Sequence, residues 1–283
     1  MSLRSEVAAV LGGLERGPDG IYSSVLPPAP DQADEIRERE TVAAREYPDL
    51  LREIGRHHSI PVMDRELRRF LRGVPVNGLV IDVGGGWGWH WRRLAHIRPD
   101  IAIVVVDFVR ANLKLAARML DRLVQSQVFL VHGDATALPF PASAFDAYWS
   151  VQTLQLIPDF EQAVNEAKRV LRPEGRFACY SVNHARLVEA VYRVMGKPYH
   201  VTGKRPGSFY LARATADHAR IVSRVFGAPA VSRYTEVLFH PDLRLSTGAA
   251  GSRVGAIDAY LSSNLPLLSW AARQRSFHSR KPA

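Results

Sequence analysis

The feature that most constrains the fold is a regular alternation of short apolar runs with amphipathic segments, which begins near Gly78. Five runs have the length and the β-branched content of buried strands: GLVIDV, IAIVVVD, QVFLVHGD, FDAYWSV and RFACYSV. Between them, residues 109–124 and 159–171 place apolar side chains on one helical face. Strands that alternate with crossover helices form right-handed βαβ units. The sequence therefore predicts a doubly wound α/β fold with a mostly parallel sheet.

The flanking segments are expected to extend this sheet and cover it. Residues 1–30 are rich in Gly and Pro and are predicted to be an extended N-terminal arm without a core of its own. Residues 31–75 are predicted to form N-terminal helices, and residues 76–283 the main domain with a helical insertion around 183–226. A strand-like run follows the insertion, and a last short strand, SFHSRK, brings the expected sheet to seven strands.

Composition narrows the class of protein. A chain of 283 residues with 47% hydrophobic residues is long enough for one large α/β domain. Cys179 is the only cysteine, which excludes an internal disulfide and a cysteine-based zinc site. The first residues lack the pattern of a signal peptide, and the longest apolar run of strand-forming residues, 101–106, is too short to span a bilayer. We therefore expect a cytoplasmic protein with no transmembrane segment and no metal.

The net charge of +9 and the pI near 10.0 favour anionic partners, nucleic acid among them. Much of the excess is arginine on helices. Within residues 61–71, Met63, Leu67, Phe70 and Leu71 form an apolar stripe, and the arginines of this region are expected on the opposite, solvated side. No basic groove interleaved with aromatic residues is recognisable. Nucleic acid therefore remains an alternative partner, and a small molecule is the favoured one.

A glycine-rich turn follows the first strand of the alternating region. It contains Gly84, Gly86 and Gly88, whereas the third glycine of the dinucleotide fingerprint would fall at Trp89. No Gly-Lys-Ser or Gly-Lys-Thr follows, so the phosphate-binding P-loop is absent as well. Glycines at such a turn let a ligand approach the backbone closely. The spacing disfavours nucleotide hydrolysis and hydride transfer.

Asp107 ends the next strand, about 20 residues after the turn, where such folds place a carboxylate that binds a ribose. A second interpretation is that Asp107 caps the helix that starts near Val109. We favour ribose binding because Asp107 and the glycine turn end neighbouring strands.

Several motifs in this order resemble the core of class I S-adenosylmethionine (SAM) dependent methyltransferases, near the branch of quinone and natural-product methyltransferases. They are VIDVGGGWG, VVVDFV, HGDATALPFPASAFDAYWS and LQLIPDFEQAVNEAKRVLRPEGRF, and they lie between Leu79 and about Val182. The resemblance implies a Rossmann-like methyltransferase fold that binds SAM and releases S-adenosylhomocysteine. It also implies that residues 31–75 cap the pocket and that the insertion around 183–226 is the acceptor lid.

The resemblance implies a set of cofactor-binding residues at the ends of the strands. The residues implied at the methionine part of SAM are Asp82, Gly84, Gly85, Gly86, Gly88, Ser150 and Val151. The residues implied at the ribose and the adenine are Asp107, Phe108, Asp134 and Ala135. Two departures stand out. Leu154-Gln155-Leu156 replaces the Leu-His-His of many relatives, and Pro173-Glu174-Gly175 replaces Pro-Gly-Gly. The first of these puts the acceptor chemistry in question.

Methyl transfer from a sulfonium requires alignment and exclusion of water, and it needs a base only if the acceptor carries a proton. No catalytic residue is assigned. Candidate bases are His90, Tyr199, His200, Tyr210 and His240. The tryptophans at 87, 89 and 91 either stack on an aromatic acceptor or belong to the core.

The sequence thus predicts a SAM-dependent methyltransferase that acts on a small or medium-sized, hydrophobic acceptor. Methylation of RNA or another anionic polymer, and a SAM-binding partner subunit without catalysis, remain as alternatives. Neither the acceptor nor the oligomeric state is indicated by the sequence.

Overall fold

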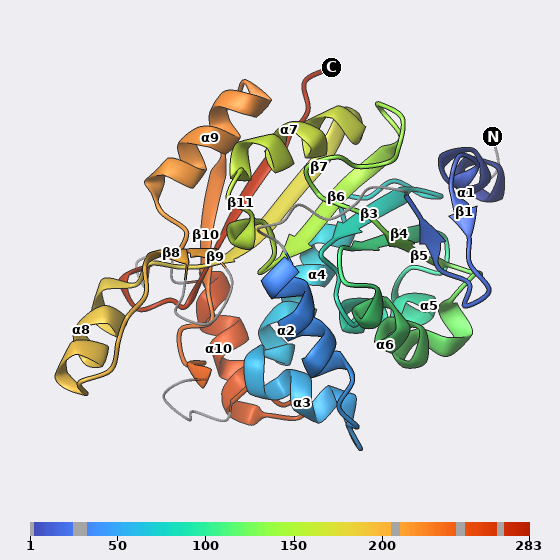
Figure 1. Cartoon of the computed structure of the whole chain (residues 1–283). Helices are drawn as coiled ribbons and strands as arrows, with labels where there is room; N and C mark the ends of the chain where they lie inside the picture. Colours follow the sequence, from blue (N-terminus) through green and yellow to red (C-terminus); the bar gives the residue numbers. More distant parts are fainter. Residues whose placement is uncertain (1–2, 25–32, 205–209, 242–246, 265–268) are drawn as a thin grey trace.

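The chain forms a three-layered α/β structure around one nine-stranded sheet (Figure 1). The structure is a computed structural model that describes residues 3–24, 33–204, 210–241, 247–264 and 269–283. In spatial order the strands are β1 (Glu15–Arg16), β2 (Tyr22–Ser23), β5 (Val128–His132), β4 (Ala102–Asp107), β3 (Leu79–Val83), β6 (Phe145–Val151), β7 (Leu171–Val182), β11 (Gln274–Arg280) and β10 (Val231–Thr235). From β2 to β7 neighbouring strands are parallel, and β11 is antiparallel to both β7 and β10. The predicted doubly wound α/β fold is confirmed.

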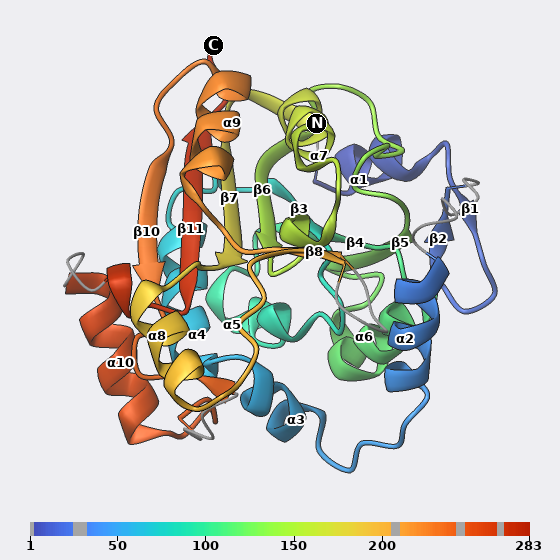
Figure 2. The same cartoon turned by 60° about the vertical axis from the view of Figure 1, so that its left-hand side comes forward.

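Helices cover both faces of the sheet (Figure 2). On one face lie α1 (Leu3–Leu11), α7 (Phe160–Val170) and α9 (Ala216–Phe226). On the other face lie α4 (Ile60–Leu71), α5 (Leu94–Ile97) and α6 (Arg110–Leu120). Outside this second layer, α10 (Arg253–Asn264) packs on α4, while α2 (Ala33–Ala43) packs on α6 and is followed by α3 (Leu50–His57). No described helix is long and apolar enough to cross a membrane.

The central strands are apolar because both of their faces are covered. All residues of β3 and β4 are buried, and along β3 the side chains alternate between the two hydrophobic cores. Strand order reverses between β3 and β6, since β4 lies on one side of β3 and β6 on the other. Open α/β sheets bind ligands at the carboxyl ends of the strands beside such a reversal. A ligand site is therefore expected at the loops that follow β3, β4 and β6.

The N-terminus differs from the extended arm that the sequence predicts. Residues 3–11 form α1, whose Val7, Val10 and Leu11 are buried in the core, and β1 and β2 form a hairpin. Strand β2 pairs in parallel with β5 and so adds two strands beyond the seven expected. The arm prediction was wrong there because the free edge of β5 supplies backbone partners that local sequence does not show. Residues 1–2 and 25–30 lie outside the described ranges.

The predicted insertion around 183–226 is shorter than expected. It comprises α8 (Arg186–Val194) and a small hairpin of β8 (Thr202–Lys204) and β9 (Tyr210–Ala212). Helix α9 belongs instead to the sheet layer, because its Val222 and Phe226 are fully buried against the sheet. The side chain of Thr215 accepts a hydrogen bond from Asp217 N and so caps this helix at its first turn.

Candidate active site

A cavity of about 580 Å³ opens at the carboxyl ends of β3, β4 and β6. Its lining comes from six parts of the chain: the α2–α3 region, the glycine turn, the segment after β4, the loop after β6, the insertion that contains α8, and the C-terminal residues 240–241 and 273. The arrangement agrees with the expected position of a pocket beside the strand reversal. It also brings together segments that are distant in sequence.

The glycine turn is held against β4 by its own backbone. Gly84 N donates to Val106 O at 2.7 Å, and Gly86 N donates to Asp107 Oδ2 at 2.8 Å. Both glycines have positive φ, and a Cβ on Gly84 would lie 2.1 Å from the Thr153 side chain. A Cβ on Gly86 would meet no atom within 4 Å and would point into open space. The turn therefore needs glycine for its shape, and Gly86 keeps the backbone accessible from the cavity.

Asp107 has a local structural role and also lines the cavity. Its Oδ1 accepts from Val109 N at 2.8 Å and from Asn112 Nδ2 at 3.3 Å. Burial raises the pKa of the carboxyl, and the hydrogen bonds from Val109 and Gly86 oppose that rise. Each carboxylate oxygen can accept more than one hydrogen bond, so lone pairs remain for hydroxyl groups of a ligand. The two interpretations of Asp107 are thus compatible.

Asp82 is the most perturbed carboxyl group of the cavity. Trp91 Nε1 donates to its Oδ2 at 2.6 Å, whereas Oδ1 is buried and has no hydrogen-bond partner. Burial raises the pKa of Asp82 to about 7, helped by the nearby Asp107 and opposed by the Trp91 bond. A buried carboxylate oxygen without a partner, at the wall of a cavity, favours a cationic ligand nearby. The ammonium and sulfonium of SAM fit this environment.

The cavity does not reach all of the predicted cofactor residues. Those that line it are Asp82, Gly84, Gly85, Gly86, Asp107, Phe108 and Val151. Gly88, Asp134, Ala135 and Ser150 do not line it. Gly88 instead packs beneath α6, where a Cβ would lie 2.6 Å from Leu120 Cδ1. The Asp134 carboxylate accepts from Thr136 N and Thr136 Oγ1, both at 2.8 Å, and closes a local turn.

Three of the candidate bases, His90, Tyr199 and His240, line the cavity, and His200 does not. The side chain of Tyr210 lies outside the described structure. His90 is buried, its Nδ1 has no partner, and burial holds its pKa well below the usual value, so the ring is neutral at pH 7. Tyr199 Oη accepts from Ala185 N at 3.1 Å and anchors the insertion.

The three tryptophans have separate roles. Trp87 lines the cavity and its ring centroid lies 5.0 Å from that of Tyr47, a residue of the segment between α2 and α3. Trp89 also lines the cavity and stacks near His90, with 3.9 Å between centroids. Trp91 is fully buried and supports Asp82. The glycine turn is followed by one 3₁₀ turn (Trp89–Trp91) and the four-residue helix α5.

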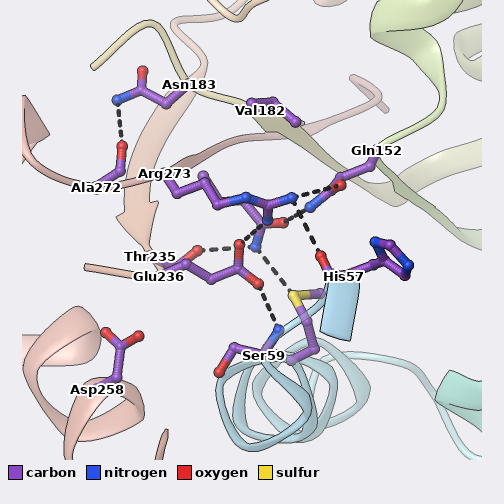
Figure 3. A network of polar contacts seen from close by, with 12 residues as sticks. His57, Ser59, Gln152, Val182, Asn183, Thr235, Glu236, Asp258, Ala272 and Arg273 are labelled. Atoms are coloured by element: carbon purple, nitrogen blue, oxygen red, sulfur yellow. Dashed lines mark hydrogen bonds and ion pairs between the residues drawn. The ribbon is translucent and has the colours of Figure 1, made fainter. Parts of the chain in front are cut away.

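A buried ion pair that the sequence did not indicate lies beside the cavity (Figure 3). Arg273, which lines the cavity, pairs with the fully buried Glu236. Glu236 Oε1 accepts from Ser59 N at 3.0 Å, and Arg273 Nη2 donates to His57 O at 3.2 Å and to Gln152 Oε1 at 3.4 Å. The pair thereby ties the end of α3 to the sheet and to the loop after β6. These partners are far apart in sequence, so no local signal could have revealed them.

The fold, the glycine turn and the two buried carboxylates define the class of protein as a SAM-binding α/β methyltransferase. A family described as "Methyltransferase domain" matches residues 81–179. The chain is 34% identical over 169 residues to a demethylmenaquinone methyltransferase of Roseiflexus castenholzii, covering 58% of this chain and 67% of that protein. It is 29% identical over 148 residues to the ubiquinone/menaquinone biosynthesis C-methyltransferase UbiE of Methylobacterium nodulans, covering 48% of this chain and 59% of that protein.

Solved structures agree on the fold. The geranyl diphosphate C-methyltransferase of Streptomyces coelicolor A3(2) has a TM-score of 0.58 at 11% identity, covering 90% of this chain and 100% of that chain. A chain of the complex between the Haloferax volcanii Trm112 methyltransferase activator and the putative methyltransferase also has a TM-score of 0.58, at 17% identity, covering 87% and 98%. The chain belongs to the class I SAM-dependent methyltransferases. The chain spans 67% of the length of the Roseiflexus relative and 59% of the length of the Methylobacterium relative, so membership of the family does not by itself assign the relatives' substrates to this chain.

Proposed function

We propose that the protein transfers a methyl group from SAM to a small hydrophobic acceptor of the quinone type. The observation that carries the proposal is a single cavity that joins the glycine turn and the buried Asp82 and Asp107 to an apolar wall. That wall includes Leu156, Val188 and Tyr192. The names of the two relatives, demethylmenaquinone methyltransferase and UbiE C-methyltransferase, support an acceptor of this class.

The proposal assigns the cofactor to the residues that line the cavity. Asp107 would bind the ribose hydroxyls, Phe108 would flank the adenine, and the glycines at 84–86 with Val151 would border the methionine part. The unpartnered Oδ1 of Asp82 would lie beside the cationic end of the molecule. SAM supplies a methyl group already activated on a sulfonium, so direct displacement suffices.

The remaining task of the chain is to align the acceptor and exclude water. We assign the exclusion of water to α2 and α3, which contribute Arg39, Val42 and Ile54 to the cavity, and to the insertion, which contributes Val188 and other apolar residues. The Arg273–Glu236 pair holds the end of α3 in this position. The neutral His90 ring stands at the same cavity and could accept a proton, but no base is assigned.

Calorimetric titration with S-adenosylhomocysteine tests the cofactor site. The wild-type protein is expected to bind, and Asp107→Ala to bind about 10- to 100-fold more weakly, because hydrogen bonds to a charged group contribute about 1.5–3 kcal/mol. The exposed Asp121→Ala serves as a matched control and should bind like the wild type. Absence of binding, or a preference for NAD, would overturn the proposal. Turnover of SAM with a reduced quinone would separate an enzyme from a SAM-binding partner subunit.

A further inference from the structure

Gln155 presents a fixed hydrogen-bond donor to the cavity. It lies in the 3₁₀ turn Leu154–Leu156, is 2% exposed and lines the cavity. Its Oε1 accepts from Val182 N at 2.9 Å. Because a backbone N–H only donates, this bond fixes the orientation of the amide, and Nε2 must be the free end. Nε2 has no hydrogen-bond partner among the described residues, yet it is not one of the fully enclosed polar atoms.

Asn183, beside Val182 at the end of β7, complements this donor. Its Nδ2 donates to Ser269 O at 3.0 Å and to Ala272 O at 2.9 Å, and Figure 3 shows the amide turned toward Ala272. Both partners are carbonyl oxygens, so this amide orientation is also fixed and leaves Oδ1 as an acceptor. Asn183 lines the cavity as well. Gln155 and Asn183 thus both line the cavity, and the first carries an unused donor and the second an unused acceptor.

The charges around the cavity favour an acceptor that carries a hydroxyl group over one that carries an amine. Of the described residues, three carboxylates line the cavity: Asp82, Asp107 and Glu53. The first two lie at the glycine turn, and Glu53 pairs with Arg56 and His57. A protonated amine beside Gln155 would thus have no carboxylate with which to form an ion pair, and burial of an unpaired charge is costly. A hydroxyl group carries no such penalty.

We propose that Gln155 Nε2 donates a hydrogen bond to an oxygen of the methyl acceptor, and that it selects acceptors with a phenol- or enol-type hydroxyl next to the carbon that is methylated. The inference rests on the proposed function and names its substrate class. Loss of the hydroxyl proton to solvent places negative charge on the oxygen and on the neighbouring carbon. That carbon forms the bond to the methyl group as the carbon–sulfur bond breaks, and loss of its own proton to solvent restores the phenol or enol. The donor stabilises the oxyanion.

This amide differs in one respect from the histidine that many relatives have in the Leu-His-His motif. An amide does not titrate, so Gln155 donates at every pH at which the protein is folded. A histidine at the same place would change its charge near neutral pH. The substitution therefore gives this chain a donor whose strength is independent of pH.

Two variants separate contact with the acceptor from support of the backbone. Gln155→Glu keeps an oxygen for Val182 N and, at an alkaline pH at which its carboxyl is ionised, replaces the donor by an acceptor of the same size. Gln155→Leu removes both. With a short-chain demethylmenaquinol kept reduced, both variants should lose about 100-fold in kcat, the magnitude of one oxyanion donor. The control Gln162→Leu, on the exposed side of α7, should retain wild-type rates. Calorimetry with S-adenosylhomocysteine should give unchanged affinity for all three, which shows that they are folded.

The outcomes distinguish this inference from the function on which it rests. If Gln155→Glu is as active as the wild type, the residue only anchors Val182 and the inference is wrong, whatever Gln155→Leu does. If the wild type binds S-adenosylhomocysteine but methylates an amine in preference to the quinol, the inference also fails while the cofactor site stands. If the wild type binds no S-adenosylhomocysteine, the proposed function itself fails.

Discussion

Replacement of Asp82 by Asn is expected to remove a pH-dependent destabilisation of the ligand-free protein and to weaken the binding of SAM. The Asp82 carboxyl is 1% exposed, and one of its oxygens has no partner. In Asn the Oδ1 atom can still accept from Trp91 Nε1, so the packing of Trp91 is retained. What disappears is the ionisation of a buried group.

The magnitude follows from the pKa of Asp82, which burial raises from 3.8 to about 7. Each unit corresponds to 1.36 kcal/mol, so ionisation of this group in the folded state costs about 4 kcal/mol. The folded state holds the proton more tightly than the unfolded state. Its contribution to stability is therefore complete below pH 3.8 and is lost as the pH rises through about 7. Between about pH 5.5 and about pH 8 the loss amounts to about 2 kcal/mol.

Urea unfolding at these two pH values measures the effect. The free energy of unfolding of the wild type should fall about 2 kcal/mol more over this interval than that of Asp82→Asn. The exposed Asp121→Asn is the control and should follow the wild type. Calorimetry with SAM should show weaker binding by Asp82→Asn alone. If the free energy of unfolding of Asp82→Asn has the same pH dependence as that of the wild type, burial does not raise the pKa of the Asp82 carboxyl.

Two further predictions concern the turn and the ion pair. Gly86→Ala should destabilise the fold by about 1–2 kcal/mol because of its φ of +54°, and should also weaken binding of S-adenosylhomocysteine in calorimetry, because the new methyl enters the cavity. Gly196→Ala, with φ of +64° and open space at an exposed site, should show the same destabilisation in urea without the loss of affinity. Arg273→Ala should lower the free energy of unfolding by about 3–5 kcal/mol because Glu236 is left buried and unpaired. Adding Glu236→Gln should restore much of that loss in urea unfolding, and no restoration would show that the carboxylate is not the cause.

Much of the fold and part of the site could be predicted from local sequence. Strands β3 and β4 are buried on both faces, so they appear in the sequence as continuous apolar runs. The glycine turn and Asp107 follow these strands directly, and parallel strands bring their carboxyl ends to one edge. The contact between Asp107 and Gly86 N is therefore implied by register once the sheet is assumed. Of the residues implied by the resemblance alone, Asp82, Phe108 and Val151 line the cavity, whereas Asp134, Ala135 and Ser150 do not.

Tertiary structure alone decided the wall of the cavity at Gln155, the buried ion pair beside the cavity and the edges of the sheet. Gln155 is an ordinary polar residue in the sequence, and it becomes a directed donor because Val182 N, on the next strand, fixes its amide. Arg273 and Glu236 lie 37 positions apart, and Ser59 is 177 positions from Glu236, so no periodicity or spacing could indicate their contact. The N-terminal hairpin likewise joins the sheet only because β5 leaves an unpaired edge. Local sequence determines which segments become strands and helices, whereas the partners of a side chain depend on which segments the closed fold brings together.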